Sequence, residues 1–304
     1  MKKLVIAAGT GFLGQALVAY FKDKAKEIII LTRKPLPLNS NIKYVYWDAK
    51  TLGSWQTELN NTDVLINLTG KSVNCRYTIT NKNEILNSRI NSTAVLGRAI
   101  KQCTHPPKHW INASTATIYR HSEDLQMDEN SGEIGADFSM NVAKMWERVF
   151  FGTDTPGTLK TAIRTSIVLG NTGGAFPIMK TLAKAGFGGK QGNGRQYISW
   201  IHELDFARAV DFIITEKLTG PVNVTAPNPI KNSNFMNALR SAVHMPIGIP
   251  QPEWLLKMGA KVIGTETELV LKSRNVVPLW LLKCGFEFTF GHAESATKAL
   301  ASVK

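Results

Sequence analysis

The chain has 304 residues, of which 43% are hydrophobic and 19% are charged, as is usual for a globular protein. No apolar run approaches the roughly 20 residues needed to cross a bilayer, so we expect no membrane segment. Lys and Arg outnumber Asp and Glu by 36 to 23, and the net charge of +13 favours anionic partners. Because these charges are scattered and form no basic stripe with stacking aromatics, we expect no nucleic-acid partner.

The cysteines and histidines indicate neither a disulfide framework nor a metal site. Cys75, Cys103 and Cys284 are far apart and odd in number, which argues against a disulfide framework. Reduced thiols of this kind fit a cytoplasmic protein. His105 and His109 share a Pro-interrupted segment, but no cysteine or carboxylate cluster accompanies them, so no metal site is expected. None of these features determines the oligomeric state.

Apolar runs and helical periodicity alternate through the first half of the chain. The pattern predicts strands at residues 3–7, 27–32, 42–47, 63–70, 109–114 and 160–170, and helices at 12–22, 81–102 and 138–151. Such alternation predicts an α/β fold with a doubly wound parallel sheet. The two lysines before the first apolar stretch also resemble a signal peptide, but the glycines and second strand that follow favour a β-α-β unit.

The composition of the sequence changes from Gly170 onward, where glycine-rich segments appear. Residues 170–177 and 186–196 are glycine-rich and indicate loops at a site. Residues 203–217 predict an amphipathic helix, and 220–229 a short strand with a Pro-rich exit. Short helical pieces broken by prolines fill residues 231–304. We therefore expect a sheet domain over residues 1–225 and a small, mainly helical C-terminal domain over 226–304, packed over the cleft.

Three glycines separate the first strand from the first helix. Gly9, Gly11 and Gly14 fit the pattern GxGxxG inside a β-α-β unit, which favours a dinucleotide site over a plain tight turn. Gly11 allows close approach of a pyrophosphate, which the free N–H groups at the helix start would bind, and Gly14 allows the helix to pack closely on the strand. The predicted cofactor contacts here are Gly9, Thr10, Gly11, Phe12, Leu13 and Gly14.

The end of the second strand indicates which dinucleotide is bound. An NAD site usually has an acidic residue there, to hold the ribose 2′-hydroxyl. This chain has Thr32, Arg33 and Lys34 instead. A guanidinium binds a 2′-phosphate with a fork of donors, so Arg33 predicts NADP(H). The alternative is a solvated loop arginine.

With these residues in place, the chain resembles an extended short-chain dehydrogenase/reductase. "AAGTGFLG" is similar to that superfamily's TGxxGxxG, "NLTG" (67–70) to its NNAG strand end, and "SWIHELDFARAV" (199–210) to a segment of nucleotide-sugar epimerases. The strings "ILNSR", "RTSIVLG", "GNGRQYISWIH", "GPVNVTAPNP" and "NVVPLWLLKCGFEF" narrow the resemblance to the atypical, epimerase-like subfamily with a C-terminal domain of unknown function. The resemblance covers essentially the whole chain.

The resemblance implies a Rossmann fold, NADP(H) binding, and an oxidoreductase or epimerase-like role on a small carbonyl or hydroxyl substrate. It implies that Asp48 hydrogen-bonds the adenine amine and that Leu68 and Gly70 line the nicotinamide ribose. Arg89 would face the cofactor phosphates or the solvent. Arg164, Arg195 and His202 match segments that line the substrate cleft, where two arginines would suit an anionic substrate, although a surface role is the alternative for each.

The chain departs from the superfamily pattern at two places. Ala8 stands where the first glycine makes the tight turn, which is costly if the turn needs positive φ. The YxxxK motif is missing: Ser139 matches the tyrosine and Ala143 the lysine, while Lys144 is one residue off and rotated by about 100°.

One element of the superfamily's catalytic set persists. Thr115 matches the hydroxyl after the fifth strand and would orient a substrate oxygen, with Tyr119 or water handling the proton. The alternative for Tyr119 is a packed aromatic ring. Because YxxxK is lost, a non-catalytic NADP(H) sensor remains a rival to the enzyme.

Overall fold

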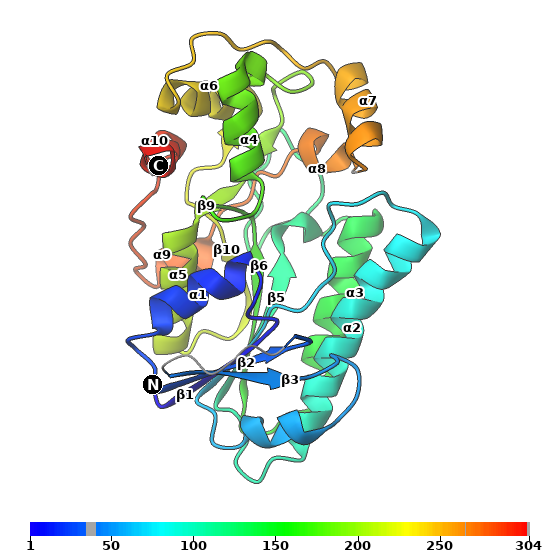
Figure 1. Cartoon of the computed structure of the whole chain (residues 1–304), viewed down its shortest axis with the longest axis vertical. Coiled ribbons are helices and arrows are strands. Elements are labelled where there is room, and N and C mark those ends of the chain that lie inside the picture. The colour runs from blue at the N-terminus through cyan, green and yellow to red at the C-terminus, as the bar shows by residue number, and fades with distance from the viewer. Residues whose placement is uncertain (35–40, 265, 303–304) are drawn as a thin grey trace.

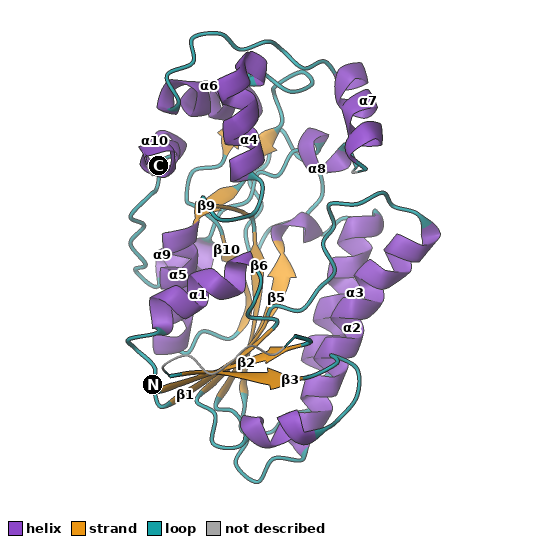
Figure 2. Cartoon of the chain, viewed as in Figure 1, coloured by secondary structure: helices purple, strands orange, loops and turns teal. Residues whose placement is uncertain are grey.

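Seven parallel strands form the central sheet of the computed structural model, which describes residues 1–34, 41–264 and 266–302. Their order across the sheet is β3-β2-β1-β4-β5-β6-β10, and helices cover both faces (Figures 1 and 2). The strands are β1 (Lys3–Ala7), β2 (Glu27–Thr32), β3 (Ile42–Tyr46), β4 (Val64–Asn67), β5 (His109–Thr115), β6 (Leu159–Thr165) and β10 (Gly220–Val224). This order is that of a Rossmann sheet with one added strand, and it confirms the predicted fold class.

Both faces of the sheet are buried, which explains why its strands are continuous apolar runs. In β1, Leu4 and Ile6 face the cluster under α1 (Phe12–Phe21) and α5 (Glu203–Thr215). Val5 and Ala7 face the opposite cluster, under α2 (Ile79–Lys101) and α3 (Phe138–Gly152). A short 3-10 helix, η1 (Ser54–Leu59), closes the second face beside α2. Alternate residues of each strand therefore pack against the two opposite helical layers.

The prediction of one strand over residues 160–170 is wrong, because the structure divides it. β6 ends at Thr165, and β7 (Ile167–Leu169) pairs instead with β9 (Trp200–His202) in a separate two-stranded sheet. The amide of Ser166 donates to the carbonyl of Val224, the last residue of β10, over 3.2 Å. Because its edge partner ends there, the chain leaves the main sheet and crosses to the second layer.

Helices and short strands build the upper part of the molecule in Figure 1. Its core joins Phe176, Trp200, Phe235 and Ala296, from both sides of the predicted boundary at residue 225. The elements are α4 (Phe176–Leu182), the π-turn η3 (Ala183–Phe187), β8 (Tyr197–Ile198), β11 (Ile230–Lys231), α6 (Asn232–Ala242), α7 (Glu253–Ile263), α8 (Glu268–Leu271) and α10 (Ala293–Ser302). The helix α9 (Leu279–Lys283) instead packs beside β10, with Leu281 in the core of the sheet. The region is mainly helical, and the boundary at 225 stays a prediction.

The first turn of α1 packs directly against the turn that follows β1. A Cβ added at Gly14 would overlap the carbonyl group and Cα of Gly9, whereas one added at Gly11 would meet only the carbonyl oxygen of Ala8, 3.9 Å away. Gly9 itself packs between Ile6 and Ile30. The contact between Gly9 and Gly14 therefore sets the position of α1 on the sheet.

Replacing Gly14 with Ala should destabilise the fold, because the new methyl group meets backbone atoms that cannot move aside. Overpacking of this kind costs about 1–3 kcal/mol. Urea denaturation would measure the loss, with Gly11→Ala as the matched control. Equal midpoints for the two variants would show that the helix can shift without cost.

Candidate cofactor and substrate site

The first helix begins without a side-chain cap. Gly11 is its N-cap residue, with φ −80°, and no side chain bonds to the first-turn amides. By contrast, Thr78 caps α2 and Asp137 caps α3. The first amides of a helix have no partner within it, so the N–H groups of Phe12 and Leu13 remain available to a ligand. A helix start of this kind at the carboxyl edge of the sheet is where Rossmann folds bind anionic ligands, and its use by this chain stays a prediction.

The turn before this helix is strained at Ala8, which has φ +61°. A left-handed conformation costs a residue with a Cβ roughly 1–2 kcal/mol. The amide of Ala8 donates to the carbonyl of Leu31 over 2.9 Å, which ties the turn to β2. The turn thus keeps the shape that a glycine would favour, although the glycine is absent.

A glycine-rich loop packs against the beginning of α1. A Cβ at Gly170 or Gly173 would lie 2.6 or 2.7 Å from atoms of Phe12, and one at Gly174 would lie 3.2 Å away. The loop after β7 can approach Phe12 only because these residues lack side chains. Residues 170–175 form a loop, whereas Phe176 and Pro177 already belong to α4 (Phe176–Leu182), and the role of this loop at a ligand site stays a prediction.

The adenosine side of the predicted site contains Arg33 and Asp48. Arg33 is exposed directly after β2, and the segment 35–40 that follows lies outside the described residues. Asp48 follows β3, and its carboxylate accepts hydrogen bonds from the Thr51 hydroxyl and from the amides of Thr51 and Lys50. These bonds lower the pKa of Asp48 to about 2, so it stays ionised and fixed at the end of the sheet.

On the predicted nicotinamide side, Gly70 contacts Arg89, and Leu68 lies two residues before Gly70. Leu68 follows β4, and its amide donates to the carbonyl of Ala7 over 3.1 Å. A Cβ at Gly70 would lie 3.1 Å from Cζ of Arg89, so the guanidinium lies directly beside this glycine. The guanidinium also lies over the ring of Trp146, 5.0 Å from its centre. Arg89 is therefore half-buried and held in place.

Thr115 and Tyr119 have different environments. The Thr115 hydroxyl lies at the end of β5, accepts from the amide of Thr117 over 3.1 Å and donates to the Thr117 hydroxyl over 2.9 Å. Tyr119 is fully buried, and its hydroxyl donates to Oδ1 of Asn223 over 3.0 Å. Burial raises the pKa of Tyr119. Of the two interpretations of Tyr119, the structure therefore matches the packed aromatic ring.

Arg164 belongs to an internal ion pair and does not line an open cleft. Its guanidinium donates to both carboxylate oxygens of Glu147, each over 2.8 Å, and to the hydroxyl of Tyr119 over 2.8 Å. The Ser114 hydroxyl donates to the same carboxylate over 2.6 Å. The network joins β5, β6 and α3 beneath the site, so Arg164 acts on the site only through its packing.

The other two predicted substrate-side residues lie apart. Arg195 is 73% exposed and pairs with Glu123 over 3.3 Å. His202 is buried, caps α5 by accepting from the amide of Leu204 over 3.0 Å, and stacks on Phe290. Burial lowers the pKa of His202. Neither side chain joins Thr115 or Arg89.

The position of the missing lysine is filled by packing. Ala143 is fully buried among Ala116, Ile118, Tyr119 and Val276, so no cation occupies that place. Ser139, at the tyrosine position, donates to Oε1 of Glu268 over 2.6 Å. No motif in the sequence singles out Tyr77, whose phenol lies near Ser139 and Glu268. Its place in a loop beyond "NLTG" follows no spacing rule that would have revealed it.

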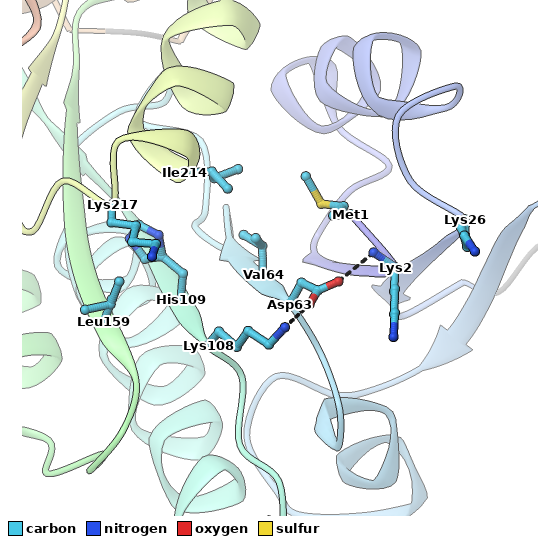
Figure 3. A pocket seen from close by; sticks show the side chains of 10 residues that line it. All are labelled: Met1, Lys2, Lys26, Asp63, Val64, Lys108, His109, Leu159, Ile214 and Lys217. Carbon is cyan, nitrogen blue, oxygen red and sulfur yellow. Dashed lines mark hydrogen bonds and ion pairs between the residues drawn. The ribbon is translucent and has the colours of Figure 1, made fainter.

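A cavity of about 520 Å³ lies at the opposite edge of the sheet (Figure 3). Met1, Lys2, Asp63 and Lys108 line it at the amino ends of the strands. Asp63 accepts from the amide of Lys2 over 2.6 Å and from Nζ of Lys108 over 2.7 Å. Rossmann ligands bind at the carboxyl edge, so this cavity is not the cofactor site.

Neither a metal cluster nor a membrane-spanning helix occurs among the described residues. No group of three or more His, Cys, Asp or Glu side chains is arranged to hold a metal ion. No helix within the described ranges has the length and apolar character needed to cross a bilayer.

The sheet order, the glycine turn and the uncapped helix define a Rossmann-type chain of the extended short-chain dehydrogenase/reductase class. Residues 4–140 match the NAD dependent epimerase/dehydratase family, and residues 251–300 match a domain of unknown function, DUF1731. Epimerase family protein YfhF of Bacillus subtilis is 34% identical over 299 residues, covering 98% of this chain and 97% of the relative. A Staphylococcus aureus relative, SAR0825, is 34% identical over 99% of this chain and its own full length. This chain belongs to the epimerase family.

Solved structures show the same fold. The human epimerase family protein SDR39U1 (isoform 2), crystallised with NADPH, has a TM-score of 0.88 and 26% identity, covering 99% of this chain and 100% of the human chain. A nucleoside-diphosphate sugar epimerase from Corynebacterium glutamicum has a TM-score of 0.78 and 27% identity, covering 99% of this chain and 58% of that chain. Both likenesses extend over the C-terminal helices as well as the sheet.

Replacing Ala8 with Gly should raise the free energy of unfolding by about 1 kcal/mol, because glycine adopts the positive φ without a clash. Ala16→Gly, in the interior of α1, is the matched control and should lower it by about 0.5–1 kcal/mol. Urea titration of both variants measures the two changes. A loss of stability in Ala8→Gly would show that the strain is absent in solution.

Replacing Arg164 with Gln should destabilise the protein by about 3–5 kcal/mol, because the carboxylate of Glu147 then stays buried without its cation. Arg120→Gln, which removes one member of the exposed pair with Glu133, should leave the midpoint nearly unchanged. Chemical denaturation compares them. If Arg164→Gln were as stable as the control, Arg164 would not be a structural residue.

Proposed function

We propose that this chain binds NADP(H) and acts as an oxidoreductase or epimerase-like enzyme on a small carbonyl or hydroxyl substrate. The observation that carries the proposal is the uncapped start of α1, with free amides at the carboxyl edge of the sheet and Arg33 exposed beyond β2. The NADPH in the human relative's structure supports the choice of cofactor.

The residues present fit a dinucleotide. Gly11 presents no side chain where a pyrophosphate would approach, and the first-turn amides have no protein acceptor. Arg33 would bind the 2′-phosphate, Asp48 the adenine amine, and Leu68 with Gly70 the nicotinamide ribose. Arg89, beside Gly70, adds a positive charge at that end. Thr10 and Gly9 complete the turn around the phosphates.

The bound nicotinamide would accept or supply a hydride at its C4 atom. Within the chain, the Thr115 hydroxyl ends β5 next to this position and would orient the reacting oxygen through a hydrogen bond. To bond a carbonyl oxygen, Thr115 must give its single proton to the substrate, and Thr117 would then donate to Thr115 across the same 2.9 Å contact. The buried ion pair of Arg164 and Glu147 joins β6 to α3, and the Ser114 hydroxyl ties β5, which ends at Thr115, to the same carboxylate. Because the Tyr119 hydroxyl is already hydrogen-bonded within this network, we propose that water supplies or accepts the proton.

A non-catalytic NADP(H) sensor is the second candidate. Ala143, buried among apolar side chains, favours it, because no lysine lies where the superfamily holds the nicotinamide ribose and lowers a tyrosine pKa. Loss of NADPH absorbance in single turnovers with a panel of carbonyl compounds supports the enzyme. NADPH binding without oxidation by any member of the panel supports the sensor.

Replacing Arg33 with Asp should weaken NADPH binding at least about 10-fold, because charge-assisted hydrogen bonds of about 1.5–3 kcal/mol are lost. NADH binding should change far less, since NADH lacks the 2′-phosphate. Titration calorimetry measures both affinities. Arg148→Asp, which makes the same charge change at an exposed site on α3, is the matched control and should alter neither. Equal losses for both cofactors in Arg33→Asp would contradict this assignment.

A further inference from the structure

The cavity at the amino edge of the sheet is built from the residues that begin five neighbouring strands. Lys2, Lys26, Asp63 and Lys108 directly precede β1, β2, β4 and β5, and Leu159 is the first residue of β6. These strands are parallel and adjacent, in the order β2-β1-β4-β5-β6. The parallel pairing therefore gathers charged side chains from distant parts of the sequence around one cavity.

The middle of the cavity is apolar. Met1, Val64 and Ile214 belong to the hydrophobic cluster under α1 and α5, and Figure 3 shows them between Lys217 on one side and Lys2 on the other. The volume of about 520 Å³ falls within the roughly 300–1,000 Å³ of small-molecule sites, which are mostly apolar with a few polar groups that orient the ligand. The lining thus suits a small molecule with an apolar body.

One carboxylate lines the cavity, and its charge is already matched. Asp63 accepts hydrogen bonds from the amides of Lys2 and Lys3, over 2.6 and 3.1 Å. It also accepts from Nζ of Lys108 over 2.7 Å, as the dashed line in Figure 3 marks. Because these three donors already hold its oxygens, Asp63 does not neutralise the other lysines of the cavity.

Three ammonium groups around the cavity have no partner. Within the described part of the chain, Lys2, Lys26 and Lys217 make no side-chain hydrogen bond and no ion pair. The acids next to two of them in the sequence, Glu27 and Glu216, are exposed and do not line the cavity. Positive charges gathered around an apolar hollow attract an anion to it.

The buried wall of the cavity contains a neutral hydrogen-bond acceptor. The Thr161 hydroxyl donates its single proton to the carbonyl of Leu218, so Nε2 of His109, 2.7 Å from that hydroxyl, must carry a proton and donate it. Burial lowers the pKa of His109 to about 4, so at neutral pH its Nδ1 has no proton. No described residue donates to Nδ1. The ring therefore adds a polar group to the wall without adding charge.

Lys217 has a backbone conformation that favours glycine. It lies two residues beyond the end of α5 with φ +52°, where helices often end in a glycine. A residue with a Cβ is strained in this left-handed region. Residues that keep such strain are often found at functional sites. An ammonium group needed at the cavity explains why a lysine occupies this position.

We propose that this cavity is a second ligand site, which binds a small organic anion with an apolar body, such as an aromatic carboxylate. The body would pack on Val64 and Ile214, and the anionic head would be attracted to the ammonium groups of Lys2, Lys26 and Lys217. The site lies at the opposite edge of the sheet from the glycine turn. Its occupation is therefore independent of NADP(H) and goes beyond the proposed function.

The test is a calorimetric titration of the full chain with 2-naphthoate, which joins an aromatic body to one carboxylate. We expect it to bind, with an affinity that falls as salt is added. The uncharged analogue 2-naphthalenemethanol should bind at least about 3-fold more weakly, because it lacks the attraction to the lysines. Acetate, which has the charge without the body, should give no measurable binding. Saturating NADPH should leave the affinity for 2-naphthoate unchanged.

A variant that combines Lys2→Gln, Lys26→Gln and Lys217→Gln locates the site. It should bind 2-naphthoate about 10-fold more weakly, because three attractive charges are lost.

The matched control makes the same charge change at exposed lysines elsewhere and should bind like the wild type. It combines Lys184→Gln, Lys283→Gln and Lys298→Gln. Lys184 and Lys298 line a separate hollow beside α6 and α10, so the control also detects binding there.

Four results would overturn the proposal: no binding of 2-naphthoate, equal affinity for its uncharged analogue, wild-type affinity in the variant that lacks the three cavity lysines, or displacement of the probe by NADPH. The last result would place the probe in the cofactor site. NADPH affinity is measured separately, so failure of the proposed function is seen by itself and leaves the titration with 2-naphthoate decisive.

Lys217→Gly separates binding from a structural role. Glycine adopts the positive φ without strain, so the urea midpoint should equal or exceed that of the wild type, while 2-naphthoate binds more weakly. A marked fall in the midpoint would mean that the lysine side chain holds the fold together, which contradicts the proposal.

Discussion

The close contact between Gly14 and the backbone of Gly9 is the constraint on which the site depends. It lets α1 lie so near β1 that the helix begins at the carboxyl edge of the sheet, with its first amides open. Any side chain at Gly14 would push the helix away and move those amides. Ala8 accepts a positive φ to complete the same turn, which shows that the turn's shape is kept even where its usual residue is lost.

The arginines around the candidate site differ in the groups that they contact. Arg164 gives three of its N–H donors to Glu147 and Tyr119 and is buried with them, so it stabilises the sheet. Arg89 donates to two backbone carbonyls, whereas Arg274 donates to the carbonyl of Ser273 and has the carboxylates of Asp137 and Glu268 nearby. A charge matched inside the protein supports the fold, whereas Arg89, which meets only neutral carbonyls, keeps its charge for a ligand. The net charge of +13 does not distinguish matched from unmatched positive charges, so it does not indicate where a ligand binds.

Much of the fold could be predicted because it follows local patterns. Strands covered on both faces are unbroken apolar runs, so the expected ranges 3–7 and 27–32 match β1 and β2. The division of residues 160–170 could not be predicted, since it depends on where β10 ends, far along the chain. The glycine turn was recognisable from its spacing. The partners of Arg164 and Tyr77 were not, because a sequence does not show which charges and hydroxyls meet inside a fold.

The most direct test of the account is a crystal structure of the protein grown with saturating NADPH. The account predicts pyrophosphate oxygens within hydrogen-bond distance of the amides of Phe12 and Leu13, and the 2′-phosphate against Arg33. A nucleotide bound elsewhere, or a start of α1 that stays empty at saturation, would contradict it.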